Sequence, residues 1–164
     1  MSLRIGLISD THGLVRPEAL AALAGCDWLL HAGDIGRLDV LQALSAVAPV
    51  HAVRGNVDTG EGLAHLPERL DLELGGLRVH LVHRPQDIDE QSATRAALVV
   101  CGHTHRPLVD EIHGTLRVNP GSAGPRRFSL PVGVGIVEVR ARAPQPRLLT
   151  LAVPPARPRR RRGA

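Results

Sequence analysis

The feature that most constrains the fold is an alternation of short apolar segments and helix-like segments over the first 53 residues. Apolar segments at 3–8, 27–31 and 50–53 have the length of buried strands, and helical patterns at 17–24 and 38–47 separate them. Pro17 stands at the first position of the first helix, where proline is tolerated. Strands connected through helices in this way run parallel. This half of the chain is therefore predicted to form an α/β unit with a parallel sheet.

The second half of the chain has a β-rich pattern. Residues 69–74 alternate polar and apolar side chains, and Gly75-Gly76 then leads into an apolar segment at 77–82, which predicts a hairpin. A short helix is expected at 86–94, a buried strand at 97–101, and further strands at 108–112, 115–118, 132–139 and 147–152. The two halves together predict two sheets packed face to face with helices outside. We expect one domain over residues 1–153 and a flexible Pro/Arg-rich basic tail over residues 154–164.

The net charge of +4 is concentrated at the C-terminal end. Residues 1–139 contain 12 of the 20 arginines and all 16 acids, so this part of the chain is acidic and is not expected to bind nucleic acid. The tail could make weak, non-specific contacts with nucleic-acid phosphates. Trp28 and Phe128 are the only aromatic residues, too few for a stacking platform along a single strand.

Cysteine usage and hydropathy indicate the compartment. The longest apolar run, residues 96–102, is much shorter than a membrane span. Cys26 and Cys101 are too few for a disulfide framework and are expected to be small buried hydrophobes. A cytoplasmic protein without a membrane partner is therefore expected, and a homo-oligomer is left open.

Side chains of the types that bind metal ions follow the predicted strands directly. In an open α/β sheet, ligands collect beyond the carboxyl ends of the strands, so residues far apart in the sequence can converge there. Imidazoles, carboxylates and one amide without a thiolate suit Mn, Fe, Co, Ni or Zn ions better than a structural zinc held by cysteines. Each short motif alone is more often a turn, but together they indicate a metal site. The residues are Asp10, His12, Asp34, Asn56, His83, His103 and His105.

A carboxylate between two divalent ions reduces their repulsion, and Asp34 on its Gly-Asp turn is the expected bridge. Five sequence blocks carry a family resemblance: Asp10-Thr11-His12, Gly33-Asp34, Gly55-Asn56-Val57-Asp58, His83 and Gly102-His103-Thr104-His105. They resemble the signature of the calcineurin-like metallophosphoesterases, and most closely the small bacterial and archaeal YfcE-like phosphodiesterase branch. Asn119-Pro120-Gly121-Ser122 and Pro125-Arg126 are similar to that branch too.

The resemblance implies a four-layer α/β/β/α sandwich of two mixed sheets and two divalent metal ions per chain. Mn²⁺ is the first choice of ion, with Ni²⁺, Zn²⁺, Fe²⁺ and Co²⁺ as alternatives. It also implies how the ligands are divided. The first ion would take Asp10, His12, Asp34 and His105, and the second Asp34, Asn56, His83 and His103.

The function expected from these residues is hydrolysis of a small phosphodiester by a hydroxide that bridges the two metals. Asp34, Asn56 and His103 are the expected catalytic residues, and Arg84 or Arg126 is the candidate phosphate clamp.

Val57 departs from the family pattern, because many members of the wider superfamily carry a histidine there as general acid. Asp58 and His31 are the alternative proton donors. Arg84 also departs from the branch, which often has glycine at this position.

Two alternatives to a phosphodiesterase remain. The same fold serves as a protein-binding scaffold in the retromer complex, with little or no catalysis. The chemistry would also suit a phosphomonoesterase or a nuclease. Of the other histidines, His31 and His51 are expected in the core or near the site, and His65, His80 and His113 at the surface or beside the ligands.

Overall fold

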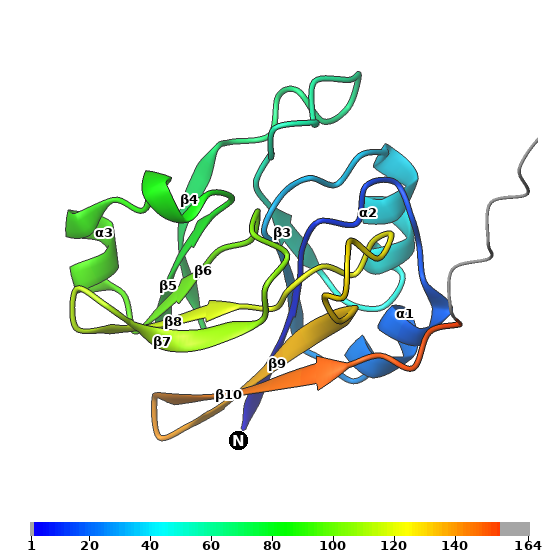
Figure 1. Cartoon of the computed structure of the whole chain (residues 1–164). Helices are drawn as coiled ribbons and strands as arrows, with labels where there is room; N and C mark the ends of the chain where they lie inside the picture. Colours follow the sequence, from blue (N-terminus) through cyan, green and yellow to red (C-terminus); the bar gives the residue numbers. More distant parts are fainter. Residues whose placement is uncertain (1, 155–164) are drawn as a thin grey trace, which may run out of the picture.

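The computed structural model describes residues 2–154, and in this part of the chain two five-stranded sheets are accompanied by three α-helices and one 3₁₀ turn (Figure 1). The elements are β1 (Leu3–Ile8), α1 (Pro17–Leu23), β2 (Trp28–His31), α2 (Leu38–Ser45), β3 (Val50–Ala52), β4 (Arg69–Leu74), β5 (Leu77–Val82), η1 (Pro85–Asp87), α3 (Glu90–Arg95), β6 (Leu98–Val100), β7 (Leu108–Ile112), β8 (Thr115–Asn119), β9 (Gly133–Arg140) and β10 (Ala143–Thr150).

The first sheet has the strand order β10-β9-β1-β2-β3. β1 pairs parallel with β2, and β2 pairs parallel with β3, so the parallel sheet predicted for the first half is confirmed. β9 lies antiparallel on the free side of β1, and β10 lies antiparallel against β9. The late strands therefore make this sheet mixed.

The second sheet has the strand order β4-β5-β6-β8-β7. The hairpin predicted around Gly75-Gly76 joins β4 to β5 in antiparallel register. β5, β6 and β8 run parallel to one another, and β7 returns antiparallel to β8. This sheet is also mixed, as the fold class requires.

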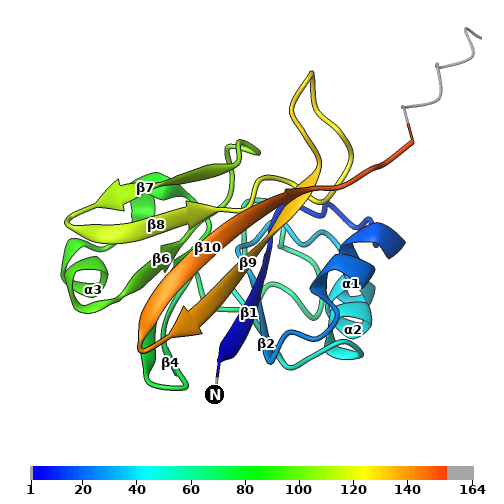
Figure 2. The same cartoon turned by 90° about the horizontal axis from the view of Figure 1, so that it is seen from below.

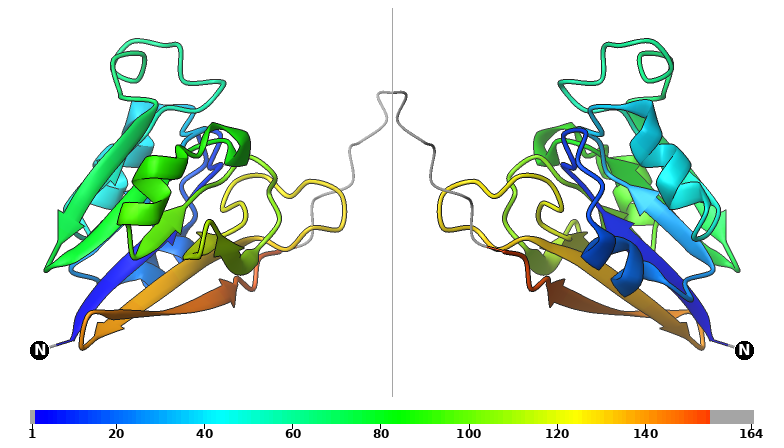
Figure 3. Two further views of the ribbon diagram at one scale, coloured as in Figure 1. Left: turned by 90° about the vertical axis from the view of Figure 1, so that its left-hand side faces the viewer. Right: turned by 90° about the vertical axis from the view of Figure 1, so that its right-hand side faces the viewer.

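The two sheets pack against each other around an apolar core that includes Leu7, Leu30, Leu81 and Val118. A second core, which includes Leu23 and Leu44, fills the space between the outer face of the first sheet and the helices α1 and α2. The helix α3 covers the second sheet on the opposite side, as the two views of Figure 3 show. The four layers of an α/β/β/α sandwich are thus present, although the fourth is a single short helix.

Most predicted boundaries lie within two residues of those observed, and two elements differ by more. The helix expected at 86–94 consists of η1 and α3, because Asp89 has an extended backbone and caps α3 by accepting a hydrogen bond from the backbone N–H of Ser92 at 2.8 Å. β10 begins at Ala143 instead of residue 147, although it contains Pro144 and Pro146. It is an edge strand, where proline is tolerated if the missing N–H would face solvent.

Within residues 2–154, no helix is both long and apolar enough to cross a bilayer. The basic tail predicted over residues 154–164 lies outside the described residues from residue 155 onward.

Candidate metal centre

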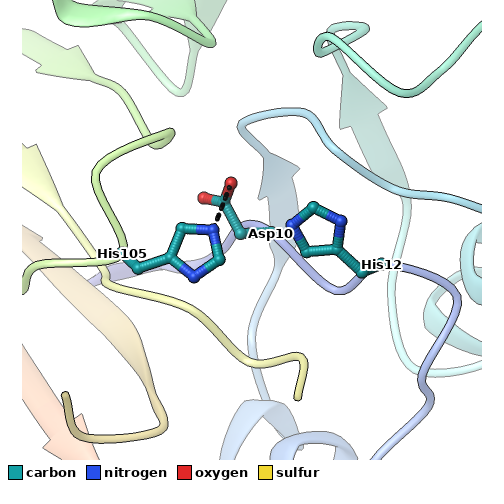
Figure 4. Close-up of side chains that lie close together, drawn as sticks. All are labelled: Asp10, His12 and His105. Carbon is teal, nitrogen blue, oxygen red and sulfur yellow. Dashed lines mark ion pairs between the residues drawn. The ribbon is translucent and has the colours of Figure 1, made fainter. Parts of the chain in front are cut away.

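The loops that follow β1, β2, β5 and β6 bring six of the seven predicted metal ligands into two groups. Asp10, His12 and His105 form one group (Figure 4), and Asp34, His83 and His103 form the other. In each group, one potential ligand atom per residue lies within 4.8 Å of the others. Each group therefore combines residues from loops at the carboxyl ends of strands in both sheets.

Asp34 faces both groups with the same oxygen. Its Oδ2 lies 3.4 Å from Nε2 of His83 and 3.8 Å from Nε2 of His12. The other oxygen, Oδ1, accepts a hydrogen bond from the backbone N–H of Val57 at 3.1 Å, which holds the carboxylate in this orientation. Asp34 thus occupies the position that a carboxylate shared by two ions requires.

Asp10 is fully buried, and its two carboxylate oxygens have different roles: one is held by hydrogen bonds, and the other faces a histidine of the site. Oδ2 accepts hydrogen bonds from the Ser9 hydroxyl at 2.6 Å and from the His103 backbone N–H at 3.0 Å. Oδ1 lies 3.3 Å from Nε2 of His105 (Figure 4). The loop after β6 can approach this closely because residue 102 is glycine, and a Cβ there would clash with Ser9 and Asp10.

Several buried polar atoms of the two groups have no hydrogen-bond partner in the described chain. Such atoms show whether the site suits a metal ion, because a bound cation would supply the missing partner. They are Asp10 Oδ1, His12 Nε2, His83 Nε2 and His105 Nδ1. An unpaired buried polar atom typically costs about 1–3 kcal/mol. Carboxylate oxygens and imidazole nitrogens are also the donors that borderline divalent cations prefer. The residues therefore fit a pair of divalent ions.

His83 is oriented for ligation by a hydrogen bond on its far side. Nδ1 lies 2.7 Å from the carbonyl oxygen of Ala32, to which it donates, so Nε2 faces Asp34. Burial lowers the pKa of His83, but the neighbouring carboxylate of Asp34, 3.4 Å from Nε2, and the charge of Asp10 outweigh it, and the pKa is raised. Burial likewise raises the pKa of Asp34, but His83 outweighs it and lowers that pKa to about 2. A proton on His83 Nε2 therefore competes with a metal ion.

The backbone is strained at nearly every residue of the two groups. Asp10, His12, Asp34, His103 and His105 have positive φ angles of 55°, 47°, 54°, 70° and 59°. Residues other than glycine adopt this left-handed conformation uncommonly, and such strain gathers at functional sites.

Asn56 and Arg84 lie beside the second group. With His83 they line an open hollow of about 300 Å³. The guanidinium of Arg84 donates two hydrogen bonds to Asp87, at 2.6 and 3.0 Å, so it is already paired in this structure. The other candidate clamp, Arg126, is exposed on the loop between β8 and β9.

His31 is fully buried beneath the site. Its Nδ1 accepts the Gly33 backbone N–H at 3.2 Å, and its Nε2 lies 3.0 Å from the Thr11 hydroxyl, which in turn donates to the Ile35 carbonyl. Burial lowers the pKa of His31 to about 4. The ring is therefore neutral and holds two of the ligand-bearing loops together. Both ring nitrogens already have hydrogen-bond partners, which disfavours His31 as the proton donor.

Asp58 is buried too, and it connects the loops after β2 and β3. Its carboxylate accepts three backbone N–H groups, from Ile35 at 3.1 Å, Gly36 at 2.9 Å and Gly55 at 2.7 Å. This role is structural, so Asp58 is also unsuited to act as the proton donor. Val57 is 46% exposed and carries no ionisable group.

Outside the site, one histidine prediction is wrong. His80 is fully buried and pairs with Asp71 at 2.8 Å, in the hairpin of the second sheet. His65 and His113 are exposed, and His51 is half-buried with its ring stacked on Trp28. Both cysteines are free and buried, and burial raises the pKa of Cys101 to about 12.

Two mixed sheets with paired groups of metal-type ligands at their shared edge define the class of metallophosphoesterases. Residues 3–142 match the model of the calcineurin-like phosphoesterase superfamily domain, and the chain belongs to this family.

Similar proteins agree with this assignment. A probable metallophosphoesterase of Methanothermobacter thermautotrophicus is 36% identical over 140 residues, which cover 77% of this chain and 81% of that protein. An archaeal phosphodiesterase structure has a TM-score of 0.74 and 23% identity, covering 90% of this chain and all of that one, which shows the shared fold. Vps29 of Entamoeba histolytica, complexed with zinc, has a TM-score of 0.66 and 25% identity, with 84% and 86% of the chains covered.

Proposed function

We propose that this protein is a cytoplasmic phosphodiesterase that hydrolyses small phosphodiesters with two divalent metal ions per chain, Mn²⁺ being the first choice. The observation that carries the proposal is the position of Asp34, whose Oδ2 faces both groups of metal-type ligands. The fully buried Asp10 and the unpaired imidazole nitrogens complete the donor set.

Two divalent ions, when bound, would supply a nucleophile from water and neutralise charge on the phosphoryl group. The residues of the chain would hold the two ions and orient them toward the substrate. Asp34 would serve both ions, Asp10 with His12 and His105 would complete one set, and Asn56 with His83 and His103 the other. His103 is exposed at the rim of the site, within reach of a bound phosphoryl oxygen.

The charge of the donor set favours a diester over a monoester. Two divalent ions carry four positive charges, of which Asp10 and Asp34 neutralise two. An anionic nucleophile and the single negative charge of a diester then bring the site to neutrality, whereas a monoester dianion adds a further negative charge. Arg84 could contribute to phosphate binding only by giving up its pairing with Asp87.

The similarity to Vps29 favours a second candidate, a protein-binding scaffold with little or no catalysis. A phosphomonoesterase or nuclease activity is the third. A scaffold does not need a metal for protein binding, although the Vps29 structure contains zinc. We prefer the enzyme because six ligand-type residues are grouped around a carboxylate that faces both groups, and several of their atoms are unpaired.

The test is turnover of bis(p-nitrophenyl) phosphate and p-nitrophenyl phosphate in the presence of Mn²⁺, Ni²⁺, Zn²⁺, Fe²⁺ or Co²⁺. We expect the diester to be hydrolysed with the higher kcat/KM. His83→Gln should abolish this activity, and the control Glu111→Gln, at an exposed position on strand β7, should retain it. Turnover of neither compound with any of these ions would support the scaffold.

A further inference from the structure

We propose that the loop between β8 and β9, residues 120–132, selects the substrate: Arg127 contacts the phosphate and Phe128 stacks on an aromatic group of the diester, such as a nucleobase. The inference rests on the proposed phosphodiesterase function and names the substrate class. Figure 2 shows this segment (yellow) projecting beyond the two sheets.

The base of the loop is attached to the backbone that carries Asp10. The Ser122 hydroxyl donates to the carbonyl oxygen of Asp10 at 2.9 Å, and the Ala123 N–H donates to the carbonyl oxygen of Ser9 at 3.0 Å. Gly124 packs so closely on Asp10 that a Cβ would clash with its carbonyl oxygen. The loop thus rises directly from the edge of the metal centre.

The loop carries positive charge that no acidic side chain of the described residues neutralises. It contains two arginines, Arg126 and Arg127, and no acid. Within residues 2–154 neither arginine forms an ion pair. Arg127 follows Gly124 by three residues, and Gly124 packs directly on the Asp10 carbonyl, so the start of the loop holds this exposed guanidinium close to the first group. An arginine in this position suits an anionic phosphate.

Phe128 follows Arg127 at the outer part of the loop and is 94% exposed, whereas the next most exposed large hydrophobic residue in the described chain, Val57, is 46% exposed. Its φ of 52° is uncommon for a bulky residue. The ring packs on none of the cores, so folding does not account for an aromatic residue here. An exposed aromatic face beside a phosphate-binding arginine is well suited to stack on a base.

The number of aromatic faces limits the size of the ligand. Trp28 is half-buried against the core between the sheets, so Phe128 is the one exposed aromatic face of the described chain. A single face holds a single base, whereas a polynucleotide binder stacks several. The substrate class is therefore a small diester in which one ester group carries a base and the other is the leaving group.

The experiment compares two diesters with the same leaving group, thymidine 5′-(p-nitrophenyl phosphate) and methyl p-nitrophenyl phosphate, in Mn²⁺. A shared leaving group removes differences in leaving-group pKa from the comparison. The wild-type protein should prefer the thymidine ester in kcat/KM, and Phe128→Ala should reduce this preference about five- to 150-fold. Phe128→Tyr should restore it and Phe128→Leu should not. The control Val109→Ala, an exposed apolar residue on β7, should leave the ratio unchanged.

Arg127→Ala should raise KM for both esters by a similar factor, because it contacts the phosphate that both share. An unchanged ester ratio in Phe128→Ala would overturn the stacking role, and unchanged KM values in Arg127→Ala would overturn the phosphate contact. If the wild-type protein hydrolyses neither ester, the phosphodiesterase function itself fails. Calorimetric titration with thymidine 5′-monophosphate then decides the inference: weaker binding by Phe128→Ala supports it, and equal binding contradicts it.

Discussion

His31 allows a sharp test of how the centre is assembled. The ring is fully buried, and both of its nitrogens take part in hydrogen bonds that connect the Thr11 loop to the Gly33 loop. The substitution His31→Asn removes the titrating group and retains an acceptor for the Gly33 N–H. The variant should be less stable than the wild type at neutral pH, and the difference should shrink on acidification.

The size of this change follows from the pKa of His31, which burial lowers from 6.5 to about 4. Above pH 6.5 the ring is neutral in both states, and its stabilising contribution is complete. Below pH 6.5 the unfolded chain binds a proton that the folded protein excludes, so stability is lost until the pH reaches about 4. At 1.36 kcal/mol per pKa unit the full loss is about 3 kcal/mol.

The assay is urea unfolding of the metal-free proteins in a chelating buffer, between about pH 7.5 and about pH 4.5. Circular dichroism is the better probe, because it reports on all strands and helices, whereas the single tryptophan reports only on its own surroundings. The exposed His65 supplies a matched control, His65→Asn, measured over the same pH range. A wild-type minus His31→Asn difference that varies by less than about 1 kcal/mol would refute the reasoning.

Three further predictions concern the metal centre. Titration calorimetry with elemental analysis should give two divalent ions per chain, and a stoichiometry of zero in metal-replete buffer would contradict the site. Asp34→Asn should lower kcat by at least about 100-fold, because it removes the carboxylate charge that both ions would share. Its circular dichroism should match that of the wild type, and wild-type turnover would be incompatible with the proposal. Val57 supplies no general acid, whose protonation of the leaving group typically raises the rate about 10²–10⁴-fold. Rates for substituted aryl diesters should therefore depend steeply on the pKa of the leaving group. A shallow dependence, with chemistry rate-limiting, would mean that a proton donor exists.

The sequence predicts the position of the centre well because the relevant signal is local. Each ligand-type residue follows an apolar strand, and parallel strands end at the same edge of a sheet. This reasoning places Asp10 and Asp34 in the same region without any knowledge of distances. The assignment of all seven residues as metal ligands stays a prediction, because grouping alone does not demonstrate binding.

Long-range hydrogen bonds are the part that the sequence does not reveal. His80 has no motif around it, and only the register of β4 against β5 places it opposite Asp71 in the hairpin. Arg84 next to His83 suggests a phosphate clamp, but the turn of η1 brings Asp87 within reach of its guanidinium. The structural role of Asp58 cannot be predicted from the sequence either, because its three backbone donors come from two loops separated in the sequence.

The backbone around the centre has a thermodynamic consequence. Five ligand-type residues have left-handed backbones, and four ligand atoms are buried without partners. Each feature costs free energy in the folded protein without a bound cation. The hydrogen bonds of Asp58 and His31, which connect the loops, and that of Ser9, which holds the Asp10 carboxylate, offset part of this cost. A cation that satisfies the unpaired atoms binds the folded chain far better than the unfolded one, so metal binding to this centre should stabilise the whole fold.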